Sequence, residues 1–318
     1  MVKIKFPDIG TLGVRHLFTA NPQKEKFSNR LANSSLKNLK WAMGRLPRWL
    51  ISAVLNGLFA VAVIGLKKQK NICQKNLRSV YGSTKNDQEY NVLTKACIKN
   101  IGHSMTDLLY FVERPHQLSR IVDIEQEDRL KKALGEGKGV IAVTAHLGNF
   151  PLLFVSLVQR GYKINVIIRP MRNKTFSRFM YELCEQWKIN MIQTVPARSF
   201  LKESLGALKR NELLFILLDE VVDRESGVRV DFLNNNVCRA VGPLLFHRRT
   251  GSPILPVFIA KENNRFRIFI EPPLAVENSL SPQDNDFKNI SALTRVIEFF
   301  VRKYPVQWGG WLNKRWTG

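Results

Sequence analysis

From about residue 121 onward, short apolar runs alternate with amphipathic stretches of helical period. The strand-length apolar runs lie at 122–124, 139–144, 164–168, 191–192, 213–218, 254–259 and 266–270. Apolar positions at helical spacing occur at 127–135, 150–160, 174–187, 199–209, 243–250 and 290–303. Strands that alternate with helices pair in parallel and carry helices on their faces. The pattern therefore predicts an α/β fold with a mostly parallel central sheet flanked by helices.

The part of the chain before residue 121 has a different pattern. Residues 1–38 are polar and basic without a sustained period, and we expect a loosely docked arm there. Residues 39–120 have a helical pattern and include an uncharged, mostly apolar segment, 49–66, with basic residues on both sides. Its length is at the lower limit for crossing a bilayer, so we expect a membrane-associated helix lying in the cytoplasmic leaflet. A buried core helix is the alternative. We expect residues 121–318 to form the α/β domain.

The formal net charge of +23 indicates an anionic partner. Nucleic acid, an anionic membrane face, and phosphorylated substrates or acidic carrier proteins all fit such a surface. The chain has no RNP, KH, zinc-finger or basic-zipper spacing, so we do not expect it to bind nucleic acid. Its four cysteines are dispersed without a CxxC pair, which indicates reduced thiols and no metal site.

The residues that follow the run at 139–144 are the leading candidates for chemistry. His146 comes just after the run, Gly148 permits a tight turn, and Asn149 can cap the helix that begins at residue 150. This order places an imidazole at the carboxyl edge of the sheet, beside helix N-terminal amides that favour negative charge. It predicts a general base for a substrate hydroxyl, with amides near Gly148 and Asn149 stabilising an oxyanion. A histidine that only satisfies a loop carbonyl is the alternative.

Two other predicted strands also end in charged residues at this edge. Asp219 and Glu220 follow the run at 213–218, where either could orient His146 or contact a substrate. Two solvated loop acids are the alternative. Arg169 follows the run at 164–168 and is suited to bind a phosphate or carboxylate, unless it is only a surface arginine.

Two basic segments near the C-terminus are further candidates for binding an anionic partner. Arg239 begins a stretch that resembles a loop entering a helix, and Arg248 lies on that helix. The pair could bind an anion or belong to a solvated basic face. The tail at 307–316 alternates tryptophans with cations, which favours a membrane interface with lipid phosphates.

Taken in order, these segments resemble the bacterial lipid A biosynthesis (lauroyl/myristoyl) acyltransferases, within the wider lysophospholipid acyltransferase group. The resemblance covers most of the chain from about residue 46. It depends on the order and spacing of the segments 76–77, 139–150, 168–170, 213–219, 232–233, 242–243, 248–258 and 307–316. It implies a glycerol-phosphate acyltransferase-like fold with a membrane-associated N-terminal segment.

The resemblance also implies a function. Such a protein works at the cytoplasmic face of the inner membrane and moves a fatty acyl chain from an acyl carrier protein thioester to a lipid hydroxyl. The acceptor would be a lipid A-type or other anionic glycolipid, or a phospholipid, and no metal or bound cofactor is needed. By position, His146 would be the general base and Asn149 part of its turn, with Arg169 and Asp219 as further site residues.

One position departs from the family pattern. The family motif is His-x4-Glu, whose acid orients the histidine, but the fifth residue after His146 is Pro151. Proline suits the first turn of a helix but cannot orient an imidazole. Two hypotheses follow. Either Asp219 or Glu220 has taken over the orienting role, or the protein has lost acyl transfer and binds a lipid or a carrier protein.

Overall fold

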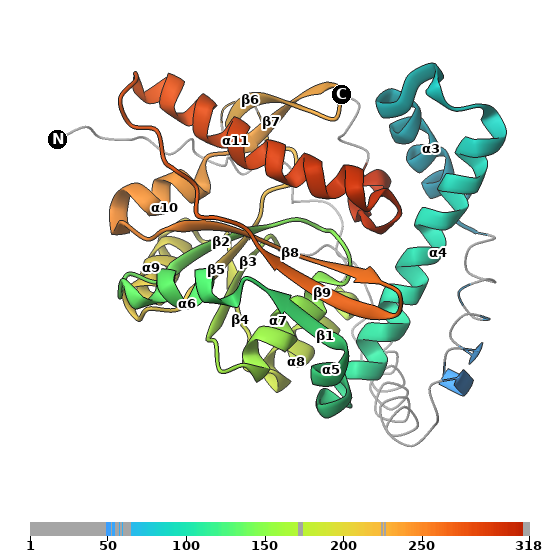
Figure 1. Cartoon of the computed structure of the whole chain (residues 1–318), viewed down its shortest axis with the longest axis horizontal. Helices are drawn as coiled ribbons and strands as arrows, with labels where there is room; N and C mark the ends of the chain where they lie inside the picture. Colours follow the sequence, from blue (N-terminus) through green and yellow to red (C-terminus); the bar gives the residue numbers. More distant parts are fainter. Residues whose placement is uncertain are drawn as a thin grey trace, which may run out of the picture.

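The computed structural model describes residues 49–51, 53–54, 57, 59, 65–170, 174–223, 225 and 227–313. A seven-stranded sheet forms the centre of the described part and has helices on both faces (Figure 1). The predicted α/β architecture is confirmed. Its strands are β1 Val122–Glu125, β2 Val140–Thr144, β3 Ile164–Ile168, β4 Asn190–Gln193, β5 Leu213–Leu217, β8 Ile254–Glu262 and β9 Arg265–Ile270.

The strand order is β1-β9-β8-β2-β5-β3-β4, and every neighbouring pair is parallel except β8 and β9. The exception has a local cause. Asn263 and Asn264 form a two-residue connection in which both have positive φ, 46° and 67°. Such a connection matches the twist of an antiparallel hairpin, so the chain turns straight back without a helix.

Most helices lie where the hydrophobic period predicts them. Their bounds are α3 Lys67–Tyr81, α4 Asp87–Val112, α5 Pro115–Ile121, α6 Glu127–Gly135, α7 Phe150–Gln159, α8 Lys174–Gln186, α9 Ala197–Lys209, α10 Gly242–Thr250 and α11 Pro282–Lys303, with short 3-10 turns η1 Gly82–Thr84, η3 Pro305–Gln307 and η4 Gly309–Leu312. The last long helix begins at Pro282 rather than at residue 290 because Ser281 caps it, accepting a hydrogen bond from the amide of Asp284.

The sheet divides the interior into two hydrophobic clusters. Along β2, Ile141 and Val143 belong to one cluster, while Val140 and Ala142 belong to the other. The first cluster contains the buried faces of α3, α10 and α11, and the second those of α5, α6 and α7. A strand covered on both faces is apolar at every position, which explains the continuous run that the sequence shows.

A second, two-stranded sheet was not predicted. It consists of β6 Gly227–Phe232 and β7 Asn235–Ala240, which pair antiparallel across the turn at Leu233 and Asn234. Both turn residues have positive φ, 49° and 62°. This hairpin packs against α11 on the first face of the sheet (Figure 1). The stretch that the sequence suggested as a loop entering a helix is therefore partly a strand.

The proposed arm at 1–38 lies outside the described residues, as does most of the apolar segment 49–66. Ile51 is buried in the second cluster, whereas Trp49 and Val54 are exposed. Among the described helices, none has the length and apolar content needed to cross a bilayer. Helices α3 and α4 share hydrophobic clusters with the sheet, through residues such as Leu77 and Leu108.

Candidate active site

The turn after β2 carries the candidate base, and one glycine makes the turn possible. Gly148 has a φ of +59°, a conformation that residues with a Cβ rarely adopt. A Cβ at this position would lie 2.2 Å from the carbonyl oxygen of Ile259 in β8. Only glycine fits so close to the neighbouring strand. The turn presses against the sheet and leads directly into α7.

His146 and Asp219 meet at the carboxyl edge of the sheet because of the register between two strands. In the parallel pair β2–β5, Thr144 lies beside Leu217, and two residues further along each chain are His146 and Asp219. His146 Nδ1 lies 2.9 Å from Asp219 Oδ1, and the His146 backbone N–H donates to Asp219 Oδ2 at 2.9 Å. A carboxylate only accepts, so Nδ1 carries the proton of this bond and Nε2 is left with its lone pair.

A third donor comes from the C-terminal segment. Trp308 Nε1 donates to Asp219 Oδ2 at 2.8 Å, and this bond is buried. The Trp308 backbone is held beside the turn that carries His146 (the His146 turn), because the Gly309 N–H donates to the carbonyl of His146 at 2.8 Å. Trp308 is therefore a site residue that the sequence reasoning missed.

Two of the three tail tryptophans, Trp308 and Trp311, do not lie at a surface, which corrects the prediction of a membrane interface for the described part of the tail. Trp308 is 2% exposed and Trp311 is 1% exposed, and both belong to the first hydrophobic cluster. Trp316 and its neighbouring cations, residues 314–316, lie outside the described residues. A buried indole N–H needs an acceptor, and this requirement was the available signal that Trp308 faces a polar group.

The electrostatics favour an ionised carboxylate beside a basic imidazole. Burial alone would raise the pKa of Asp219, but the His146 ring and the hydrogen bonds from His146 and Trp308 outweigh it and lower the pKa to about 2. Burial opposes a charged His146, yet the Asp219 carboxylate outweighs it and raises the pKa of the imidazole. The His146 side chain is 33% exposed while that of Asp219 is 1% exposed. The arrangement presents one face of a basic ring to solvent.

Asn149 plays a different part from the one expected. The helix does begin at Phe150, but the Asn149 side chain makes no capping bond. Instead, its Nδ2 donates to the carbonyl of Ser104 in α4 at 2.7 Å, and the residue is 3% exposed. Asn149 therefore ties the His146 turn to α4.

The amides near the turn are only partly available for an oxyanion. The Gly148 N–H donates to the carbonyl of Gln307 at 2.9 Å, which removes it from the predicted set. The N–H groups of Asn149 and Phe150 make no hydrogen bond within the described chain. Free amides at the start of a helix are the usual sites of anion binding. These two lie at the start of α7, beside the His146 turn.

Glu220 and Arg169 pair with each other rather than with His146. Arg169 Nη1 lies 3.4 Å from Glu220 Oε2, and both side chains are partly exposed, at 49% and 39%. They follow β3 and β5, which are neighbours in the sheet. Glu220 adds to the negative charge near the imidazole without a hydrogen bond to it. Of the two acids that the sequence left open, Asp219 contacts the ring.

The sequence suggested that Arg239 lies in an accessible loop, but the structure places it elsewhere. It is in β7, it is 0% exposed, and all three of its guanidinium nitrogens lack a hydrogen-bond partner within the described chain. The guanidinium lies 4.3 Å from the centre of the Phe232 ring, and burial lowers its pKa to about 10. Phe232 in turn packs edge-on against Trp308. Arg239 is therefore buried in the hairpin that β7 forms with β6.

Arg248 is also separate from the pair of His146 and Asp219, which we call the dyad. Its Nη1 donates to Asp286 in the first turns of α11 at 2.6 Å. Helix α10 ends shortly before β8, and β8 runs parallel to β2, so this end of the helix lies near the amino edge of the sheet. His146 lies at the opposite edge. The structure does not bring Arg248 to the His146 turn.

The family acid is absent where the motif would place it. Pro151 lies in the first turn of α7, where proline suits the backbone because no amide hydrogen is needed. His146 contacts this helix through Phe150, whose ring packs edge-on at 5.2 Å. Within the described residues, no group of three or more His, Cys, Asp or Glu side chains could hold a metal ion.

Comparisons with known proteins identify a family. The family model described as bacterial lipid A biosynthesis acyltransferase matches residues 33–317. Lipid A biosynthesis palmitoleoyltransferase of Escherichia coli (strain K12) is 22% identical over 284 residues, which cover 86% of this chain and 87% of that protein. Phosphatidylinositol mannoside acyltransferase of Mycolicibacterium smegmatis is 22% identical over 279 residues, or 85% of this chain and 88% of that protein. The chain therefore belongs to the bacterial lipid A biosynthesis acyltransferase family.

Proposed function

We propose that the protein transfers a fatty acyl chain from a thioester to a hydroxyl of a glycolipid, with His146 as general base and Asp219 as its orienting acid. The observation that supports this most strongly is the 2.9 Å contact between His146 Nδ1 and Asp219 Oδ1. It leaves Nε2 free on a ring that is partly open to solvent. A base needs this combination of a fixed tautomer and an accessible nitrogen.

The reaction proceeds through a tetrahedral intermediate. His146 Nε2 accepts the proton of the acceptor hydroxyl while the hydroxyl oxygen forms a bond to the thioester carbonyl carbon. The carbonyl oxygen becomes an oxyanion, and the imidazolium that forms is stabilised by the Asp219 carboxylate. When the carbon–sulfur bond breaks, the departing sulfur takes the proton from Nε2. The products are an ester and a free thiol, and His146 returns to its starting state.

The amides at the start of α7 are placed to stabilise the oxyanion. Asn149 and Phe150 have free N–H groups beside the His146 turn. The positive end of the helix dipole adds to their effect on a developing negative charge. In this proposal they replace Gly148, whose amide is already bonded to Gln307.

For the donor and acceptor we propose an acyl carrier protein thioester and an anionic glycolipid. One relative is named for lipid A biosynthesis and another for acyl transfer to phosphatidylinositol mannoside. Both acceptors carry sugars on a lipid. A net charge of +23 suits anionic partners of this kind and an anionic membrane surface. We place the protein at the cytoplasmic face of the inner membrane, where such a donor and acceptor would meet.

A non-catalytic role in binding a lipid or a carrier protein is the second candidate. Pro151 motivates it, because the family motif has an acid there. The Asp219 contact argues against it, since the ring already has a carboxylate partner. The two candidates differ in what happens when the base is removed.

The test is a transfer assay with a radiolabelled acyl carrier protein thioester and a lipid A precursor. Wild type should form labelled lipid, and His146→Ala should reduce the rate by about 10³-fold or more. His103→Ala is the matched control, because His103 lies on α4, outside the His146 turn. Equal background transfer by wild type and His146→Ala would leave only the binding role.

A further inference from the structure

A groove on the solvent side of α11 combines exposed aromatic rings with cations. It has a volume of about 540 Å³, and it lies between α11 and strand β6 of the hairpin. We call it the α11 groove and define it by Phe287, Lys288, Arg295, Phe299 and Arg302. A smaller hollow of about 320 Å³ adjoins it and shares two of these residues, Lys288 and Arg295.

The three cations of the groove lie along one face of the helix. Lys288, Arg295 and Arg302 are spaced by seven residues, which is close to two helical turns. Lys288 pairs with Glu277 at 2.8 Å and Arg302 pairs with Glu298 at 2.7 Å. Arg295 lies between them, is exposed, and has no ion pair or hydrogen bond in the described part of the chain. The middle one of these three cations therefore presents an unpaired guanidinium.

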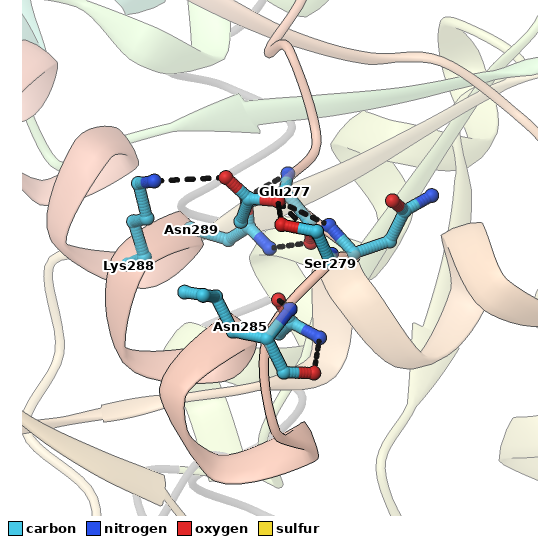
Figure 2. A network of polar contacts seen from close by, with 7 residues as sticks. Glu277, Ser279, Asn285, Lys288 and Asn289 are labelled. Carbon is cyan, nitrogen blue, oxygen red and sulfur yellow. Dashed lines mark hydrogen bonds and ion pairs between the residues drawn. The ribbon is translucent and has the colours of Figure 1, made fainter.

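Hydrogen bonds fix Lys288 and the smaller hollow that adjoins the groove, which Glu277 and Asn289 line. Figure 2 shows Lys288 reaching Glu277, while Asn289 bonds both backbone groups of the same residue. The Asn289 Oδ1 accepts from the Glu277 N–H and its Nδ2 donates to the Glu277 carbonyl, each at 2.8 Å. Ser279 adds further bonds to the Glu277 carboxylate. A surface fixed in this way loses little conformational entropy when a partner binds.

Two phenylalanines in the groove are unusually exposed. Phe287 is 52% exposed and Phe299 is 59% exposed, although both lie on a helix whose other face enters the core. Single exposed apolar side chains are ordinary. Aromatic rings beside arginines, however, are the composition typical of protein interfaces. The groove has both within one concave surface.

We propose that the α11 groove docks the acidic carrier protein that presents the acyl thioester, an inference that rests on the proposed function. Arg295 supplies the central contact to a carboxylate of the partner, and the two phenylalanines receive its apolar side chains. Charge complementarity favours this occupant, because a protein with an acidic helix can place single carboxylates opposite single cations.

Other occupants fit the charges less well. Asp231 and Glu298 also line the groove, and they would repel a uniformly anionic membrane face. A second copy of this chain carries a net charge of +23, which opposes docking on a stripe of cations. The chain's own residues 1–48 contain ten Lys and Arg against two Asp and Glu, so they are excluded by the same repulsion.

The position of the groove connects it to the dyad. Arg302 is six residues before Trp308, the residue that donates to Asp219. Between them, α11 ends at Lys303 and η3 leads the chain directly to the His146 turn. A carrier bound along α11 would therefore lie next to the segment that supports the site.

The experiment compares two donors that bear the same acyl chain, acyl carrier protein thioester and S-acyl-pantetheine. For each enzyme form, kcat/KM is measured with both donors, and their ratio reports recognition of the carrier protein itself. Arg295→Glu should lower this ratio by about tenfold or more, because one attractive charge pair becomes repulsive. The effect should shrink as NaCl concentration rises. Lys132→Glu is the matched control: it makes the same change in net charge at an exposed position on α6, on the other face of the sheet.

The outcomes separate the two proposals. Wild type that transfers from neither donor contradicts the proposed function. Wild type that uses both donors, with an unchanged ratio in Arg295→Glu, overturns the docking proposal alone. If the donor ratio falls equally in Arg295→Glu and Lys132→Glu, the docking proposal is also overturned, since the effect would then follow net charge. An unchanged ratio together with loss of binding to phosphatidylglycerol vesicles in Arg295→Glu would assign the groove to the membrane instead. Phe299→Ser should lower the ratio in the same direction without a change of charge.

Discussion

Two buried charges lie near each other in this protein, and their surroundings differ completely. Asp219, at the end of β5, accepts hydrogen bonds from the His146 ring, the His146 amide and the Trp308 indole. Arg239, in the β6–β7 hairpin, has no hydrogen-bond partner for any of its three guanidinium nitrogens within the described chain. Both side chains are almost fully buried.

The difference shows in the direction of each pKa shift. The partners of Asp219 outweigh its burial and lower its pKa to about 2, so the fold stabilises the charged form. Burial dominates at Arg239 and lowers its pKa to about 10, so the fold disfavours the charged form. Burial alone does not decide whether a charge is stable; the donors and acceptors around it do. The comparison separates a buried charge that has three hydrogen-bond donors from one that has no hydrogen-bond partner in the described chain.

The largest expected effect belongs to Asp219→Asn. The Asn oxygen would accept from the two N–H groups that now donate to Oδ2, which turns its NH2 toward Nδ1 and favours the wrong tautomer. The neutral amide also cannot stabilise the imidazolium, so kcat/KM should fall by about 10³–10⁴-fold. Asp219 raises the pKa of His146, so the variant's pKa should be lower, and the acid limb of the pH–rate profile should move to lower pH. Residual transfer measured across that profile checks both expectations.

Glu220→Gln is the control for this variant, because Glu220 pairs with Arg169 and makes no bond to the ring. We expect it to change kcat/KM by less than about tenfold. A stronger loss in Glu220→Gln than in Asp219→Asn would reverse the assignment of the orienting acid.

Next in size is Trp308→Phe, which keeps an aromatic ring but removes the donor to Asp219. We expect transfer to fall by about 10- to 100-fold, since supporting bonds of this kind commonly matter to that extent. The free energy of unfolding should fall by about 1–3 kcal/mol because a buried acceptor loses a partner. Denaturant titration and the transfer assay measure the two effects.

Trp311→Phe sharpens this result. The Trp311 indole donates to the backbone carbonyl of Pro305 instead, so the substitution removes a partly buried bond that involves neither His146 nor Asp219. It should reduce stability to a similar extent and leave kcat/KM near wild type. If both variants lose activity equally, Trp308 acts only through the packing of the tail.

Arg239→Met should raise the free energy of unfolding, whereas the tryptophan variants should lower it. Methionine has a similar volume and no charge, so it removes a buried cation that lacks hydrogen bonds. We expect the free energy of unfolding to rise by about 1–3 kcal/mol, more than the attraction to the Phe232 ring that is lost. Arg198→Met, at an exposed position on α9, should change it by less than about 0.5 kcal/mol. A loss of stability in Arg239→Met would mean that Arg239 is an ion partner of Asp219, and the contrast between the two charges would disappear.

The smallest effect is expected for Pro151→Glu, which restores the acid of the family motif. Asp219 already occupies Nδ1, so a second carboxylate has no ring hydrogen to accept, and kcat/KM should change by less than about threefold. The transfer assay with wild type alongside measures this. A gain of tenfold or more would show that Asp219 orients His146 poorly and that the missing acid limits the rate.

Local features of the site could be predicted from the sequence because they depend on neighbouring residues. The apolar run of β2, the glycine turn and the helix that starts at Phe150 lie within a short stretch of chain, and their order places His146 at the sheet edge. The same holds for the alternation of strands and helices that predicted the sheet. Contacts between distant segments could not be predicted in this way. Asn149 looked like a helix cap, yet its side chain bonds to Ser104, 45 residues earlier.

The sequence by itself determined that a histidine stands at the carboxyl edge of a parallel sheet and that two acids, Asp219 and Glu220, end another strand. Only the tertiary structure decided which acid meets the ring, because that depends on the register that places Leu217 beside Thr144. It also placed the Trp308 indole within hydrogen-bond distance of Asp219 and buried Arg239 with no hydrogen-bond partner among the described residues. Hydrophobic period and turn chemistry act over a few residues and can be read along the chain, whereas hydrogen bonds between segments appear only when packing has brought them together.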